Sequence, residues 1–162
     1  RQMCIRDRYR CDNVIISPGQ EKVVFSVTNT DRNSLEKLSQ CVNNFLTKAY
    51  TTSLIAYGIN GNFIDEDGSS FAEVLDGMSD TNQILDNGYE IVTAKISRTL
   101  SKNGKKINMD SKLENARLEI SFNENHSNPK EYPTFDFELL NGFIEECSEI
   151  VKGLGYELEG DE

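Results

Sequence analysis

An amphipathic stretch from Ser34 to Tyr50 constrains the fold more than any other part of this chain. Apolar side chains recur there at intervals of three and four residues, and polar side chains fill the positions between them. Because residues three and four apart share one face of a helix, the spacing predicts a single helix with one apolar stripe. Asn33 is the expected N-cap, with Glu36 three residues later as in a capping box. The apolar positions are Leu35, Leu38, Cys41, Val42, Phe45, Leu46 and Ala49.

Several segments around this helix have the patterns of antiparallel strands. β-branched runs at 14–16 and 23–27 flank a turn at 17–20 that contains Pro18 and Gly19, which predicts a hairpin. Residues 54–63 form a further apolar run. Apolar and polar residues alternate over 92–100 and again over 116–122, on either side of the tight-turn dipeptide Asn103-Gly104. These strands predict a sheet with one buried and one solvated face.

Two more helices are predicted. A long amphipathic helix covers Phe137 to Leu154 and ends near two glycines, Gly153 and Gly155. A short helix occupies 71–78, preceded by a capping box of Ser70 and Glu73.

The predicted fold class is therefore α+β: a curved antiparallel sheet of five or six strands, with two long amphipathic helices packed on one face and one short helix. We expect a single domain over 11–155 and an acidic tail over 156–162. The opening RQMCIRDR, Arg1 to Arg8, resembles translated adapter sequence, so we expect residues 1–10 to be a non-native or disordered lead.

The charge balance narrows the kinds of partner. The net charge is -10 over 162 residues, and residues 11–162 carry 13 Lys and Arg against 26 Asp and Glu, a net charge of -13. A phosphate-binding surface needs clustered cations, and the nearest group here is Lys102, Lys105 and Lys106. We therefore expect no direct binding of nucleic acid, and an acidic surface that favours a basic protein partner.

The four cysteines form no CxxC pair, and His126 is the only histidine, so the usual zinc spacings are missing. Cys41 and Cys147 fall on the apolar faces of the predicted long helices, where a cysteine acts as a small buried hydrophobe. This use of cysteine is typical of a reducing compartment, and we expect a cytoplasmic protein. No stretch approaches the length of about 18 apolar residues that a membrane span needs. The sequence predicts no cofactor.

A possible calcium loop follows the strand at 54–63. Asp65, Asp67, Ser69 and Asp76 supply oxygens, but the sixth position from Asp65 is Ser70 instead of glycine, and the twelfth is Asp76 instead of glutamate. We expect a solvated loop and no metal. Gly58, within the preceding strand, predicts either a bulge or a close approach by the covering helix.

Two residues are candidates for catalysis. His126 could act as a general base, with Glu124 close in sequence, but the sequence shows no nucleophile for it. Cys147 could be a nucleophile only if its pKa were lowered, and the glutamates around it would raise that pKa. We therefore expect neither residue to be catalytic.

The leading functional hypothesis is a non-enzymatic, acidic protein-interaction domain, comparable to an immunity protein, an inhibitor or a complex subunit. Its partner-binding residues would be Glu145, Glu146 and Glu149, on the polar face of the last helix. The first alternative is a small apolar-ligand binding protein with a cavity between the curved sheet and the last helix. The second is a hydrolase-type enzyme that uses His126.

Overall fold

The computed structural model describes residues 8–48, 55–66, 86–89, 92–115, 117–127 and 134–158. Within them the chain forms seven strands and two helices, and the strands make two antiparallel sheets of three and four strands. The α+β class is confirmed. The single sheet of five or six strands is wrong, because the N-terminal strands pair only with one another. The predicted short helix at 71–78 lies outside the described residues.

The chain divides into two compact units. The first combines Arg1–Ile55 with Asn128–Glu146, and the second combines Ala56–Ser127 with Cys147–Glu162.

The sheet of the first unit has the order β1-β2-β3, made by Tyr9–Cys11, Val14–Pro18 and Val23–Ser26. The predicted hairpin is confirmed, with Pro18 opposite Val23 where the β2–β3 turn begins. The Gly19 amide donates to the Lys22 carbonyl at 2.7 Å and closes this turn. Asp12, in the β1–β2 turn, has a φ of 55°, a left-handed conformation that aspartate tolerates better than most residues.

Helix α1, Arg32–Lys48, starts earlier than the predicted cap allows. Its N-cap is Asp31, whose Oδ1 accepts the Ser34 amide at 2.9 Å and whose Oδ2 accepts the Ser34 hydroxyl at 2.9 Å. Asn33 lies inside the first turn. Aspartate is the better cap here because its two carboxylate oxygens meet both donors of Ser34.

The buried stripe of α1 also differs from the predicted one. Ser34, Leu35 and Ser39 are buried, whereas Phe45 is 41% exposed and meets Phe25 of β3 edge to face, with ring centroids 5.4 Å apart. The Ser39 hydroxyl donates to the Leu35 carbonyl at 2.8 Å. A serine can be buried on a helix when its hydroxyl bonds to the preceding turn, and a rule based on apolar periodicity cannot see this.

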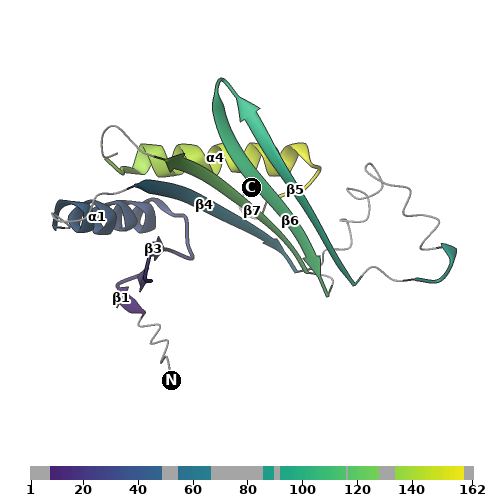
Figure 1. The fold of residues 1–162 in the computed structure, drawn as a ribbon, viewed down its shortest axis with the longest axis horizontal. Coiled ribbons are helices and arrows are strands. Elements are labelled where there is room, and N and C mark those ends of the chain that lie inside the picture. Colours follow the sequence, from purple (N-terminus) through teal and green to yellow (C-terminus); the bar gives the residue numbers. More distant parts are fainter. Residues whose placement is uncertain are drawn as a thin grey trace. The chain divides into compact units, whose positions relative to one another are not determined.

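The sheet of the second unit has the order β4-β7-β6-β5 (Figure 1). Its long strands are β4 (Ala56–Asp65), β5 (Thr93–Lys102), β6 (Lys105–Glu114) and β7 (Arg117–Ser127). The β5–β6 hairpin turns at Asn103 and Gly104, with φ of 53° and 83°. Two consecutive positive φ values suit the right-handed twist of the strands, which explains the Asn-Gly pair.

Strict alternation separates the two faces of this sheet. Leu118, Ile120 and Phe122 of β7 are buried, and Phe63 of β4 meets Phe122 edge to face at 5.7 Å. The predicted inward positions of β7 are thus confirmed. The other buried apolar residues of this face are Ile59, Ile107 and Met109.

Gly58 of β4 marks neither a bulge nor a helix contact. The β4–β7 register is continuous, with Gly58 opposite Asn125. A Cβ at Gly58 would lie 2.9 Å from the Asn125 Oδ1 and 3.2 Å from the Asn123 Nδ2. The close approach that the glycine permits therefore comes from side chains of the neighbouring strand.

Helix α4, Phe137–Gly153, is the second long helix. Asp136 caps its start, accepting the Leu139 amide at 2.8 Å. Its end has the Schellman pattern: the Tyr156 amide donates to the Val151 carbonyl, and Gly155, with φ 92°, donates to the Lys152 carbonyl. The residues of α4 up to Glu146 belong to the first unit, with Leu140 and Phe143 buried. The residues from Cys147 onward belong to the second, with Cys147 and Val151 buried.

The Asp31 cap predicts a pH-dependent stability. Hydrogen bonds from the Ser34 amide and hydroxyl hold the pKa of Asp31 below its model value of 3.8. A lowered folded-state pKa stabilises the protein above the unfolded value, and this stability is lost as the pH falls through the folded value. Asp31→Asn should therefore lower the melting temperature at pH 6, and the difference from the wild type should shrink towards pH 3.

The matched control is Glu21→Gln, which neutralises an exposed carboxylate in the β2–β3 turn. If the Asp31→Asn deficit stays constant from pH 6 to pH 3, the carboxylate does not cap the helix in its charged form.

Candidate functional site

Helix α4 carries the three glutamates predicted to bind a partner. Glu145 and Glu149 are exposed and lie one helical turn apart, as their spacing of four requires. Glu145 accepts a hydrogen bond from the Asn141 Nδ2 at 2.7 Å. Glu146 is half-buried and has a partner of its own. Two of the three carboxylates are thus open to solvent.

A cluster of polar side chains surrounds His126 on the covered face of the four-stranded sheet. Glu124 of β7 is 8% exposed, and its two oxygens meet Lys105 Nζ at 2.8 Å and His126 Nε2 at 2.9 Å. The ring of Tyr57, opposite His126 in the β4–β7 register, stacks on the imidazole with centroids 4.4 Å apart and planes 9° apart. Three strands, β4, β6 and β7, therefore contribute to one constellation.

The buried carboxylate decides the electrostatics of this cluster. A buried carboxylate is costly unless it is paired and hydrogen-bonded, and Glu124 has both a cation and an imidazole beside it. Burial raises the pKa of the Tyr57 phenol, and the negative charge of Glu124 raises it further. Tyr57 is therefore a neutral phenol at pH 7, and its ring orients the imidazole by stacking.

The arrangement has two of the three parts of a catalytic triad. A carboxylate bonded to one imidazole nitrogen fixes the ring and leaves the other nitrogen to act as a base. The His126 side chain is 38% exposed, so this base could meet a substrate. Within the described part of the chain, no hydroxyl or thiol hydrogen bonds to His126, so any nucleophile it activates would be water.

The periodicity of β7 could have revealed this cluster. Positions 118, 120 and 122 point to the covered face, and continuing the same alternation puts Glu124 and His126 there as well. The predicted strand ended too early to include them. Lys105 and Tyr57 were missed because cross-strand register, which no local pattern fixes, brings them to His126.

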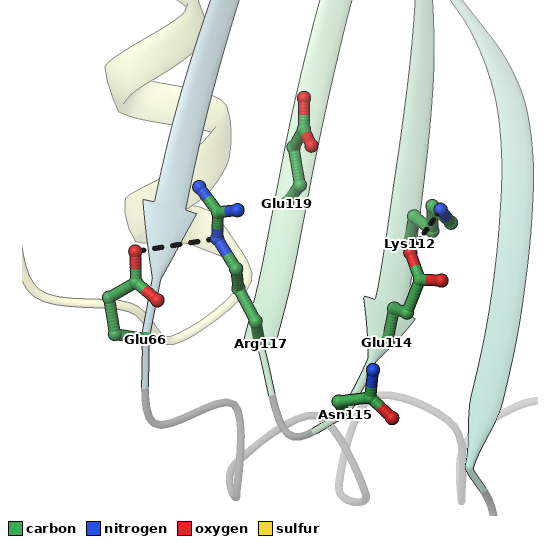
Figure 2. Close-up of a pocket in the computed structure, with 6 residues that line it drawn as sticks. All are labelled: Glu66, Lys112, Glu114, Asn115, Arg117 and Glu119. Carbon is green, nitrogen blue, oxygen red and sulfur yellow. Dashed lines mark hydrogen bonds and ion pairs between the residues drawn. The ribbon is translucent and has the colours of Figure 1, made fainter.

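A shallow polar hollow of about 350 Å³ opens at the other end of the same strands (Figure 2). Within it, Arg117 Nε lies 3.3 Å from Glu66 Oε1, and Lys112 pairs with Glu114. Because charged and amide groups line it, this hollow offers little to an apolar molecule. It is not the apolar cavity that the ligand-binding alternative requires. The lining residues are Glu66, Lys112, Glu114, Asn115, Arg117 and Glu119.

The remaining predicted positions add no site. Asp65 is the last residue of β4 and is half-buried, while Asp67, Ser69 and Asp76 of the proposed calcium loop lie outside the described residues. No group of three or more potential metal ligands occurs among the residues that the structure describes. In the same residues, no helix is long and apolar enough to cross a membrane.

Comparison of the chain with protein-family models, with curated proteins and with solved structures finds no match in any of the three. A functional proposal therefore has to rest on the chain's own residues.

The Lys105–Glu124 pair predicts a specific loss of stability. Lys105→Met should cost about 1–3 kcal/mol, because it leaves a buried carboxylate without its cation. Adding Glu124→Leu should recover most of that loss, since the double variant removes both charges from the covered face. Urea unfolding measures both effects.

Lys106→Met is the matched control, because Lys106 is the exposed neighbour on the opposite face of β6. It should change the free energy of unfolding by less than about 0.5 kcal/mol. Equal losses in the Lys105 and Lys106 variants would show that the pair does not support the fold.

Proposed function

We propose that this chain is an acidic, non-enzymatic interaction domain that binds a basic protein partner, in the way that an immunity protein, an inhibitor or a complex subunit does. The observation that carries the proposal is the excess of carboxylates over cations, a net charge of -13 over residues 11–162.

The distribution of ion pairs supports an outward acidic potential. Six cations lie within 3.3 Å of carboxylates of the same chain. Exposed pairs of this kind add little stability, but they cancel positive charge locally. The carboxylates in excess then dominate the field that an approaching protein meets. The six cations are Arg32, Lys37, Lys95, Lys105, Lys112 and Arg117.

Helix α4 is the best candidate for the contact surface. Glu138, Glu145 and Glu149 are exposed, and none of them forms an ion pair with another residue in the described ranges. A rigid helix presents such carboxylates at fixed spacing, which suits Lys and Arg side chains on a partner.

The decisive variant is Glu145→Lys with Glu149→Lys. With a partner captured from cells of the chain's source, the association rate should fall about tenfold or more, because charge reversal removes long-range attraction. Raising the salt should slow the wild type and leave its dissociation rate nearly unchanged, since exposed charges are screened over about 8 Å at physiological ionic strength. Surface plasmon resonance over a salt series separates the two rates.

Glu21→Lys with Glu157→Lys is the matched control, because it makes the same change in net charge at two exposed positions outside α4. If both double variants slow association equally, the attraction is not located on the helix. If the α4 variant associates at the wild-type rate at every salt concentration, the proposal fails.

A hydrolase-type enzyme is the second candidate, favoured by the Glu124–His126–Tyr57 constellation. It requires His126 to deprotonate water. Turnover of small ester substrates by the purified protein, abolished in both His126→Gln and Glu124→Gln, would favour it over the interaction domain.

A further inference from the structure

The turn between β1 and β2 is fastened to helix α1 at two points. Asp12 Oδ2 lies 3.1 Å from Lys37 Nζ, and Asn13 Nδ2 donates a hydrogen bond to the Ser34 hydroxyl. Ser34 is buried and Asn13 is half-buried, so the second contact is shielded from water. The first turns of α1 therefore hold this hairpin in a fixed place.

This docking brings two cysteines together. Cys11 immediately precedes Asp12, and Cys41 lies one helical turn beyond Lys37 on the same face of α1. Burial raises the pKa of the Cys41 thiol, and the neighbouring Cys11 raises it further through its charge and a side-chain hydrogen bond. Both thiols are free in the structure.

We propose that Cys11 and Cys41 form a thiol–disulfide exchange site, which closes in response to an oxidised low-molecular-weight disulfide such as glutathione disulfide. Cys11 is exposed and is the entry point. Its thiolate attacks one sulfur of glutathione disulfide, which leaves a mixed disulfide on Cys11 and releases one glutathione. The Cys41 thiolate then attacks the Cys11 sulfur and releases the second glutathione. The two thiol protons pass to the two glutathione molecules.

The two cysteines differ in their roles because their surroundings differ. The half-buried Cys41, with its raised pKa, is a poor target for an external reagent but a well-placed resolving thiol once Cys11 has reacted. Cys147 is fully buried and takes no part. In a reducing compartment such a pair stays open, and it closes only when the glutathione pool becomes oxidised.

Closure would link β1 to α1 across a loop of about 30 residues. A cross-link of this length restricts the unfolded chain, so the oxidised protein should melt about 10 °C higher than the reduced one. The site is independent of the proposed partner surface on α4.

The test uses the full chain with Cys4→Ser, which removes the one other thiol in the N-terminal segment. After incubation with glutathione disulfide at pH 8, mass spectrometry should show a loss of two hydrogens and a peptide that contains both Cys11 and Cys41. In the same background, Cys41→Ser should accumulate one glutathione adduct on Cys11, and Cys11→Ser should gain neither an adduct nor a cross-link.

A positioning variant separates geometry from simple thiol reactivity. Lys37→Ala removes the ion pair to Asp12 and should slow closure several-fold, while the glutathione adduct on Cys11 forms at the wild-type rate. Lys48→Ala, at the other end of α1, is the control and should change neither rate.

Three outcomes would overturn the proposal. The parent protein could stop at the glutathione adduct, which would show that Cys41 cannot reach Cys11. The cross-link could persist in Cys11→Ser, which would assign it to other cysteines. The oxidised and reduced proteins could also melt at the same temperature, which would show that no native-state link forms. Peptide mapping of the parent protein gives the first answer even if a serine variant folds poorly.

Discussion

Strand β7 pairs with β4 on one edge and with β6 on the other, so its register decides which side chains of three strands share the covered face. A slip of one residue would move every apolar side chain of β7 to solvent. The same register places Glu124 within reach of Lys105 and sets Tyr57 against His126. The apolar core and the polar cluster of the second unit are therefore two results of one strand alignment.

Charge is organised differently within the units and at their surface. Each described ion pair brings together groups from one compact unit, and only Glu124 among their carboxylates is buried. The exposed pairs contribute little to stability, but they leave the excess carboxylates to determine the external field. A fold of this kind can tolerate charge reversal on α4 while it depends on the neutralisation of Glu124.

Local patterns predicted the elements well, and they failed where long-range pairing or polar contacts decide. The Asn103-Gly104 turn, the inward positions 118, 120 and 122 and the two long helices follow from periodicity and turn chemistry. The division into two sheets does not, because nothing local in Val14–Pro18 or Val23–Ser26 specifies which strands they pair with. The Asp31 cap and the buried serines of α1 depend on side-chain hydrogen bonds. Of the candidate site, the exposed glutamates of α4 were predictable, and the partners of His126 were not.

The central claim is that β7 is an interior strand while β4 and β5 are edges of the described sheet. Amide hydrogen exchange by NMR tests it directly. Every amide from Leu118 to Glu124 should exchange slowly, because successive amides of an interior strand bond alternately to its two neighbours. Thr93–Lys102 should alternate between slow and fast exchange, since an edge strand leaves every second amide unbonded. Alternating protection in β7, or uniform protection in β5, would contradict the strand order on which this account depends.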